Sequence, residues 1–432
     1  MLCDDKMMIR NFKSLSTTKA KKDTLSIIEA GLEAALPRNS IEKIIKNDCI
    51  HIYGKKIHLK KYDKVFVIAV GKAAYSMTSA VNSHTCINGG LLVVPLKTKT
   101  SLGKKFKVIQ AGHPVPNNNS IMAAKNILDF LSSTVHNDFI IFLISGGASS
   151  LVALPDSISL GEKQVVTNLM LKCGANIHEI NCIRKHLSKI KGGRLLDCLR
   201  SDAISLVMSD VVGDDLSSIA SGMTYFDNTT FGDAKKILKK YHLESFLPKS
   251  VLQRIDLGVK GKIPETPKRE KIKNYVISTN KNCLEAMNTR AKDLGFSTRI
   301  QNCISGDVKD VGTKITKTFS RTKVDCIIFG GETTVIVKGK GKGGRNQELV
   351  LYMVSNLTKQ CMHAIVASVG TDGIDGTTNY AGAIWQTGEK IEKIKHYLEK
   401  NDSYHFFNKY GGLIFTGPTG TNLMDVGLVF RQ

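Results

Sequence analysis

The stretch KGKGKGGRNQE, at residues 338–348, alternates lysine with glycine immediately before an apolar-periodic segment that predicts a helix. Bare glycine backbone and the free amides of a helix start together favour a bound phosphate, whereas a solvated basic tether is the alternative. The loop joins an apolar strand pattern, TTVIV, to the helix, so both of its ends are held. We therefore favour anion binding, with Arg345 at the helix start and Gly343, Gly344 and Asn346 beside it.

A second glycine-rich stretch, ISGGASSLVALP at 144–155, follows an expected buried strand. Amides of Gly146 and Gly147, with hydroxyls of Ser145 and Ser149, suit an oxyanion or a phosphate. An ordinary tight turn is equally well supported. The G-x-S-x-G elbow of hydrolases is missing from this stretch.

Lys72, in VGKAAYSM, occupies the first turn after another expected strand. A solvated lysine would explain it, but a cation at a helix start opposes the helix dipole, and an anionic ligand would compensate. A Walker A loop is absent from the sequence. The basic stretch at 181–195 adds Arg184 and Lys191, which are seven residues apart and share one helix face. They could hold a carboxylate or a phosphate, unless this is merely a solvated face.

Acidic residues cluster in SDVVGDD, at 209–215, after a further expected strand. Asp210 and Asp214 repel each other unless a cation neutralises them, and oxygen ligands alone suit Mg²⁺ better than Zn²⁺. A capping turn is the alternative, although one aspartate would suffice for it. Glu332 is a further candidate metal ligand and Asp372 a candidate substrate contact, but turn chemistry explains each alone.

Strands must position these residues. We predict four parallel strands that are covered on both faces, because four runs are nearly all apolar: 64–70, 90–95, 138–144 and 203–208. Amphipathic helices are expected near 72–84, 120–134, 162–175 and 232–242, with Asn119 and Ser120 as N-cap candidates for the second. This alternation predicts an α/β fold with a Rossmann-like, doubly wound parallel sheet. Polar loops follow the strands, which places a ligand-binding edge at their carboxyl ends.

A chain of 432 residues favours two domains. We expect an N-terminal domain over 22–255, a linker or surface excursion over 256–273, and a C-terminal α/β domain over 274–432 that includes the strand NYVIS. The C-terminal sheet is expected to be mixed, because two apparent strands between 325 and 339 lie too close for a crossover helix. The simplest arrangement is one binding cleft between the two ligand-binding edges, and we expect it here.

The composition is that of a soluble globular protein, with 42% apolar and 23% charged residues. The net charge of +23 raises nucleic acid as a partner, but the lysines are dispersed, only 6% of residues are aromatic, and no binding signature stands out. No run approaches the roughly 18 apolar residues of a membrane span. Ten cysteines without a C-x-x-C pair indicate a reducing compartment. We expect the cytoplasm, with the mitochondrion as the alternative.

Eight motifs in this order resemble the class II glycerate kinases, which pair an N-terminal glycerate kinase domain with a C-terminal MOFRL domain. They are VGKAA, AGHPVPNNNS, ISGGASSLVALP, NCIRKHLSKIKGGRL, SDVVGDDLSSIASG, GGETTVIVKGKGKGGRNQE, GTDGIDGTTNYAGA and TGPTGTN. The resemblance covers roughly residues 22 to 432.

The resemblance implies phosphorylation of D-glycerate by ATP at the 2-hydroxyl, giving 2-phosphoglycerate, with Mg²⁺ as helper and the active site between the domains. The family's active-site lysine corresponds to Lys72, its arginine to Arg345, and its acidic loop to Asp210. The chain departs from the family pattern at Ala148, Met223 and Asn379, where glycine, proline and aspartate are usual.

Three alternative functions stay open. The product could be 3-phosphoglycerate. A hydroxypyruvate reductase would need a nicotinamide site, but the G-x-G-x-x-G fingerprint after the first strand is missing. A non-catalytic small-anion binding protein would keep the glycine loops without needing the acidic cluster. The sequence leaves the oligomeric state open.

Overall fold

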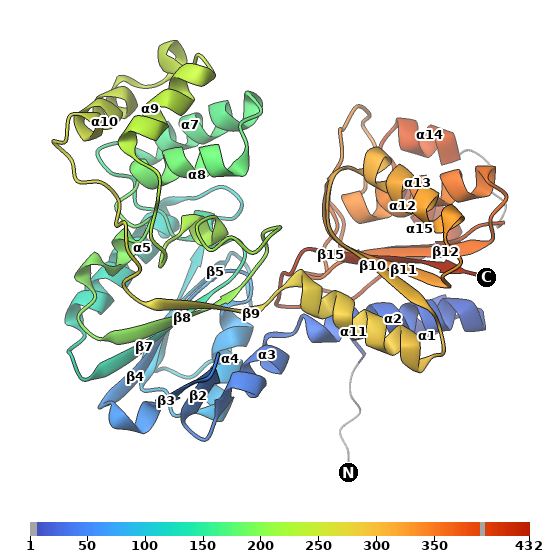
Figure 1. Ribbon diagram of the computed structural model, residues 1–432, viewed down its shortest axis with the longest axis horizontal. Helices are drawn as coiled ribbons and strands as arrows, with labels where there is room; N and C mark the ends of the chain where they lie inside the picture. Colours follow the sequence, from blue (N-terminus) through green and yellow to red (C-terminus); the bar gives the residue numbers. More distant parts are fainter. Residues whose placement is uncertain (1–6, 389–393) are drawn as a thin grey trace. The chain divides into compact units, whose positions relative to one another are not determined.

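The computed structural model describes residues 7–388 and 394–432. The chain divides into two compact units (Figure 1). The first unit is Ser40–Ile277, and the second unit combines Met1–Asn39 with Ser278–Gln432. Among the described residues no helix is long and apolar enough to cross a membrane, and the nine described cysteines are all free thiols.

The first unit is built on a six-stranded sheet in the order β6-β5-β4-β7-β8-β9. Its strands are β4 (Lys64–Val70), β5 (Gly89–Pro95), β6 (Phe106–Ala111), β7 (Asp138–Ile144), β8 (Asp202–Met208) and β9 (Lys273–Ser278). The pairings of β4 with β5 and β7, of β5 with β6, and of β7 with β8 are all parallel. The predicted doubly wound parallel sheet is confirmed. The strand order reverses between β4 and β7, and ligands bind at such a reversal in open α/β sheets.

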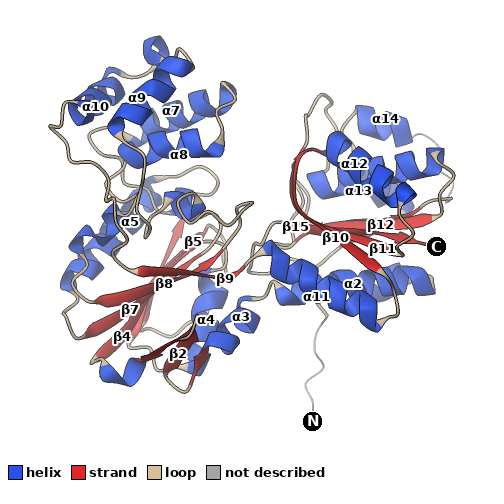
Figure 2. Cartoon of the chain, viewed as in Figure 1, coloured by secondary structure: helices blue, strands red, loops and turns tan. Residues whose placement is uncertain are grey.

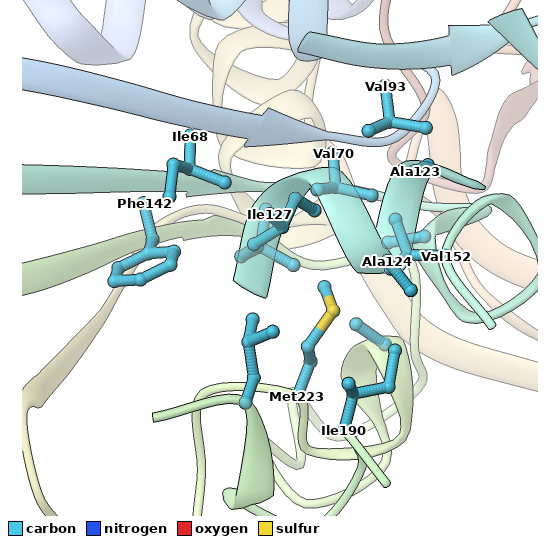
Figure 3. Packing of buried hydrophobic residues seen from close by; sticks show 14 of the residues in the cluster. Ile68, Val70, Val93, Ala123, Ala124, Ile127, Phe142, Val152, Ile190 and Met223 are labelled. Atoms are coloured by element: carbon cyan, nitrogen blue, oxygen red, sulfur yellow. The ribbon is translucent and has the colours of Figure 1, made fainter. Parts of the chain in front are cut away.

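Two helices, α4 (Ala74–His84) and α5 (Asn118–Ser133), pack on this sheet. Ala123, Ala124 and Ile127 of α5 meet strand residues such as Phe142 in one apolar cluster, which also takes in Met223 (Figure 3). The N-cap of α5 is Asn117, whose side chain accepts from the Ser120 amide, so the predicted cap at Asn119 or Ser120 was two or three residues late.

Four further helices form a group of their own in the first unit, with α7 (Leu160–Lys172), α8 (Ile177–His186), α9 (Phe231–Lys240) and α10 (Lys249–Val259) packed around a separate apolar cluster (Figure 2). The helices predicted near 162–175 and 232–242 are therefore present, but they contact one another instead of crossing the sheet. The first unit also contains the short helix α6 (Ala148–Leu151) and a small antiparallel sheet of β1 (Ile45–Lys46), β2 (Cys49–Ile52) and β3 (Lys55–His58).

The second unit has a six-stranded sheet in the order β10-β11-β15-β12-β13-β14. Its strands are β10 (Thr298–Asp307), β11 (Cys326–Thr334), β12 (Ala364–Gly370), β13 (Gly382–Gln386), β14 (Leu413–Ile414) and β15 (Asp425–Arg431). Only β10 and β11 pair in parallel, so the mixed sheet is confirmed. The reason differs from the expected one, because the second apparent strand does not exist: Ile336 and Val337 are 65% and 70% exposed.

Helices cover both faces of this second sheet (Figure 1). On one face lie α1 (Phe12–Leu15), α2 (Lys19–Ala34) and α11 (Asn280–Asp293), and on the other lie α12 (Val308–Arg321), α13 (Arg345–Lys359), α14 (Ile394–Glu399) and α15 (Ser403–Tyr410). Helix α3 (Pro37–Ile44) spans the division between the units.

The observed units differ from the predicted domain boundaries at both ends of the first domain. Helix α2, expected in the first domain, packs on α11 in the second unit, where a Cβ on Gly31 would lie 2.7 Å from Met287 Cγ. The strand NYVIS, expected in the second domain, is β9 of the first sheet. The predicted linker at 256–273 also lies in the first unit, where Asp227 and Arg194 bond the carbonyls of Pro267 and Pro264. Hydrophobic periodicity identifies an element but not the partner it packs against.

Candidate functional site

In the first unit, the loops after β4 and β7 are tied together where the strand order reverses. The amide of Lys72 donates to the Gly146 carbonyl at 2.8 Å, and the amide of Ala73 donates to Ser145 Oγ at 3.0 Å. Gly71 has a φ of +134°, and a Cβ there would lie 2.1 Å from Ser145 Oγ, so only glycine fits. Ser145 and Gly146 are buried and shape the loop through these bonds, and the predicted ligand contact of the two residues stays a prediction.

A cavity of about 440 Å³ opens beside this loop junction, within the first unit. Its polar lining comes from the loop after β6, the loop after β7, and helices α7 and α8, and includes His113, Gly147, Ser149, Ser150, Lys163, Gln164 and Arg184. Pro114, Val115, Pro116 and Leu171 supply apolar walls. Two of the described lining residues are cationic side chains and none is acidic, so the cavity suits a ligand that carries negative charge.

Gly147 brings the cavity close to Lys72. Its φ of +84° is a left-handed conformation, and a Cβ at this position would lie 2.7 Å from His113 Cδ2 and 3.6 Å from Lys72 Cγ. The next residue, Ala148, is buried in the apolar cluster of the first unit. Its methyl group therefore points into the core, and the departure from the family's glycine does not narrow the cavity.

Three basic side chains, Lys163, Arg184 and Lys191, interact with one another at this cavity. Burial lowers the pKa of Lys163 to about 8, with the charge of Arg184 adding to the effect. Burial also lowers the pKa of Arg184. The pKa of Lys191 is lowered well below its usual range, first by burial and then by Lys163 and Arg184. The predicted pair Arg184 and Lys191 is thus near enough to interact, and Lys163 was not predicted.

Lys191 does not reach the ligand space, however. Its side chain is 1% exposed, and its ammonium donates to the Ala220 carbonyl at 3.1 Å. Lys191 is not among the residues that line the cavity, whereas Arg184 is. The prediction that Lys191 contacts a substrate is corrected for this reason.

The hydroxyl groups of the cavity serines Ser149 and Ser150 form hydrogen bonds within the protein. Ser149 Oγ lies 2.7 Å from Ser221 Oγ, and Ser221 in turn donates to Asn181 Oδ1 at 3.0 Å. Ser149 is therefore the donor of the first bond and presents lone pairs to the cavity. Ser150 donates to the Gly147 carbonyl at 3.0 Å. Ser149 can accept from a substrate hydroxyl, whereas the predicted donation to an oxyanion is not available in this arrangement.

The acidic loop after β8 is partly used by a turn. Asp215 accepts from the Ser217 amide and from the hydroxyls of Ser217 and Ser218, at 3.0, 2.8 and 2.7 Å. Asp210 and Asp214 remain partly exposed at the carboxyl end of β8. Among the described residues no group of three or more His, Cys, Asp or Glu side chains could hold a metal ion by itself. The third predicted ligand, Glu332, belongs to the second unit.

In the second unit, Arg345 is held by two carboxylates. Its Nε and Nη2 donate to the two oxygens of Asp425 at 2.6 and 3.0 Å, and Nη1 donates to Glu332. Burial alone would lower the pKa of Arg345, but the carboxylates of Asp425, Glu332 and Asp375 raise it. Asp425 begins β15 and Glu332 is near the end of β11, so the sheet fixes the guanidinium at the start of α13.

The backbone amides at the start of α13 already donate to a carboxyl group of the protein itself, that of Asp375. Asp375 accepts from the Asn346 and Gln347 amides at 3.0 and 2.9 Å, and burial raises the pKa of this carboxyl to about 7. Asn346 is itself buried, and its side chain accepts from Ser368 at 2.6 Å. The predicted phosphate grip at this helix start is therefore corrected, since the bound anion is the protein's own Asp375.

The glycine–lysine loop before α13 is an irregular segment that packs on residues 400–403. A Cβ on Gly339, Gly341 or Gly343 would lie 2.1 to 2.4 Å from Lys400, Asp402 or Ser403. The intervening side chains of Lys338, Lys340 and Lys342 are exposed. The loop is therefore packed on the second unit and is not the free tether that the sequence left as one choice, and binding of an anion by its exposed lysines stays a prediction. Gly344 likewise packs on Asp375.

Asp372, the remaining predicted contact, lies in the same region of the second unit. Its Oδ1 accepts from the Ile374 amide at 3.1 Å. A Cβ on Gly370 would lie 3.2 Å from Asp372 Oδ1 and 3.4 Å from Asp425 Oδ1, so the two carboxylates flank the same glycine. Asp372 therefore belongs to the carboxylate group around Arg345.

Three residues of the site, Lys163, His113 and Asp425, were not predicted individually from the sequence. His113 lies in the motif AGHPVPNNNS, which could have identified it. Lys163 sits in a helix with lysines at both of its faces, and Asp425 is a single acid before an apolar strand. No sequence motif marks either residue as part of a site, because the roles of both depend on burial and on neighbours from distant segments of the chain.

The fold and the site together define a two-domain α/β protein with a cavity lined by Lys163 and Arg184 at the strand reversal of its parallel sheet. Residues 23–256 match a family described as a domain of unknown function, DUF4147. Residues 325–425 match the MOFRL family.

Comparison with known proteins is consistent across nearly the full length. The chain is 39% identical to a glycerate 2-kinase of Pyrococcus horikoshii, covering 93% of this chain and 95% of the relative. A solved glycerate kinase of Thermotoga maritima is 35% identical, with a TM-score of 0.82 over 95% of this chain and 99% of that one. A putative hydroxypyruvate reductase of Agrobacterium vitis is 34% identical, covering 83% of this chain and 85% of the relative. The chain belongs to the class II glycerate kinase family.

Proposed function

We propose that this protein transfers the γ-phosphoryl group of ATP to the 2-hydroxyl of D-glycerate, giving 2-phosphoglycerate and ADP. The observation that carries the proposal is the cationic cavity beside Lys72, with no acidic side chain in its described lining, in a chain of this family. Glycerate, ATP and the product are all anions, so such a cavity attracts every reactant.

Phosphoryl transfer requires alignment and charge neutralisation more than covalent chemistry. Arg184 binds an anionic group of a substrate in the cavity, and Ser149 accepts a hydrogen bond from a substrate hydroxyl. Lys72 stabilises negative charge on the transferred phosphoryl group. Lys191 acts as a positioning residue, since it holds the Ala220 carbonyl next to Ser221, the partner of Ser149.

Arg345 is the corresponding cation of the second unit. Its ion pairs with Asp425 and Glu332 fix the guanidinium in one orientation, so it can meet developing charge without first losing side-chain freedom. Asp372 lies near this group and is proposed as a substrate contact.

Mg²⁺ fits the site only as a partner of the nucleotide. Mg²⁺ usually keeps several waters and is bound by one or two carboxylates together with substrate phosphates. Asp210 and Asp214, partly exposed after β8, would hold it, and Glu332 is less suited because it pairs with Arg345. When bound, the ion would neutralise phosphate charge.

Three alternative functions have less support. A hydroxypyruvate reductase would need a dinucleotide loop after β4, but that loop reads Gly71, Lys72, Ala73 and lacks the G-x-G-x-x-G spacing. Formation of 3-phosphoglycerate would use the same cavity with the substrate reversed. A non-catalytic anion-binding protein would have no use for Asp210 and Asp214.

The proposal is tested with the purified chain in two parallel assays. We expect ADP release from MgATP that depends on D-glycerate, and no oxidation of NADH by hydroxypyruvate. NADH oxidation without ADP release would favour the reductase, and binding of D-glycerate without either reaction would favour the non-catalytic protein.

A further inference from the structure

Lys163 of α7 is a buried cation that no described residue neutralises. Its side chain is 7% exposed and lines the 440 Å³ cavity. Among the residues that the structure describes, no hydrogen bond or ion pair reaches its ammonium group. A buried ammonium without a partner costs several kcal/mol of folding free energy, on the order of what a lost buried ion pair costs.

The groups that face Lys163 make this cost larger. Arg184 of α8 lines the same cavity, the buried Lys191 lies near enough to interact with Lys163, and His113 comes from the loop after β6. The two cavity serines direct their protons to Ser221 and to the Gly147 carbonyl. The cavity therefore holds positive charge and lone pairs but no described carboxylate, and a ligand must supply the negative charge.

We infer that Lys163, together with Arg184, binds an oxyanion of a substrate in this cavity. The inference rests on the proposed function, which supplies two sources of that oxyanion: the carboxylate of glycerate and a phosphate of the nucleotide. Lys163 provides three donors on a flexible stem, and Arg184 provides a planar fork, so the two can grip adjacent oxygens of one group.

The ionisation of Lys163 gives this binding a pH dependence. Burial lowers its pKa to about 8, with Arg184 as the next cause. The ammonium form is needed to attract an anion, so affinity falls as pH rises above about 8. A bound anion favours the charged form and shifts this loss to higher pH.

The test uses the full chain and the variants Lys163→Met and Lys163→Gln, with Lys172→Met as the matched control. Lys172 ends the same helix and is exposed. Dissociation constants for D-glycerate, ATP and inorganic phosphate are measured separately by calorimetry at pH 7 and pH 9, and ligand-free melting temperatures are recorded for each protein.

We expect Lys163→Met to weaken binding of at least one of the three anions by tenfold or more, to abolish the loss of that affinity between pH 7 and pH 9, and to leave the ligand-free melting temperature unchanged or higher. A fall for D-glycerate alone assigns Lys163 to the carboxylate, and a fall for ATP assigns it to a phosphate. The melting temperature separates binding from structure, because removing an unpaired buried charge should not destabilise the fold.

Affinities within twofold of the wild type for all three anions would overturn the inference. So would a loss of affinity accompanied by a lower ligand-free melting temperature in both Lys163 variants. The proposed function fails separately, if the wild-type chain binds these anions but transfers no phosphoryl group.

Discussion

Arg345 donates to both oxygens of Asp425, at 2.6 Å from Nε and 3.0 Å from Nη2. The pair joins the first residue of α13 to the first residue of β15. A guanidinium held in this two-bond geometry has little freedom left to lose when a reaction begins. The contribution of the fixed orientation of Arg345 to turnover should therefore be measurable separately from the contribution of its charge.

Replacing Arg345 with alanine should reduce turnover by roughly 10²-fold or more, if the guanidinium stabilises charge in the transition state. Asp425→Asn should lower kcat more than it changes KM, because Arg345 keeps its charge and loses its fixed orientation. Steady-state kinetics of both variants, beside Arg321→Ala on the surface of α12, check this. Normal turnover in Arg345→Ala would remove the residue from the mechanism.

Lys72→Ala should likewise reduce turnover by roughly 10²-fold or more, with the fold preserved. The backbone contacts of Lys72 with Gly146 survive the substitution, because they use only the main chain. Lys104→Ala, an exposed lysine of the same unit, is the control. A Lys72→Ala enzyme as fast as this control would contradict the assignment.

Removing one partner of the buried pair of Lys185 and Asp227 should strongly destabilise the first unit. Their side chains are 3.2 Å apart, and Asp227 also accepts from Thr229 and Thr266. Asp227→Ala should lower the unfolding free energy by about 3–5 kcal/mol, because it leaves the Lys185 charge buried and unpaired. Denaturant unfolding measures this.

Its control is the double variant Lys185→Met with Asp227→Ala. The double variant should be more stable than Asp227→Ala alone, since it removes the uncompensated charge. Equal stability of the two would show that the lost hydrogen bonds, and not the charge, account for the effect.

In the loop before α13, substitution of a glycine should lower stability, whereas substitution of a lysine should have little effect. Gly339→Ala places a Cβ 2.1 Å from the Lys400 carbonyl, so it should cost roughly 1–3 kcal/mol of stability. Lys340→Ala should change stability by less than about 0.5 kcal/mol, because its side chain is exposed. Chemical denaturation compares the two, and equal effects would argue against the close packing.

Asp375 should make stability depend on pH between about 4 and 7. Its pKa is raised from 3.8 to about 7, first by burial, so the folded state binds more protons than the unfolded state in this range. The sign follows: the unfolding free energy falls as pH rises from 3.8 to about 7 and levels off above it.

Asp375→Asn should remove this slope and also weaken the start of α13, because an amide has only one oxygen to accept from the Asn346 and Gln347 amides. Urea unfolding at several pH values measures the slope. A slope that is the same in both proteins would assign it to other groups.

The sequence predicted the fold class and the loops of the first unit, because uniformly apolar strands and glycine-rich turns are local signals. Gly147, predicted from its loop, and Arg184, predicted from its helix face, line the cavity, and Lys72 lies beside Gly147. Packing partners carry no such signal. Helix α2 and strand β9 were therefore each expected in the other unit.

Side-chain roles within the site were less predictable for the same reason. Lys191 was expected to contact a ligand but is buried against Ala220, and the helix start beside Asn346 is capped by Asp375. Both outcomes depend on residues about thirty positions away in the chain. Lys163 shows the opposite case. Nothing in the sequence marks this helix residue, and it becomes part of the site only because α7 places it beside Arg184.

Phosphorus NMR of the purified chain with D-glycerate and MgATP tests the central claim most directly. The account predicts a growing phosphomonoester resonance that matches authentic 2-phosphoglycerate, in proportion to the ADP formed, and its near-complete loss in Lys72→Ala. A resonance matching 3-phosphoglycerate, or unchanged ATP in the presence of the wild-type chain, would contradict it.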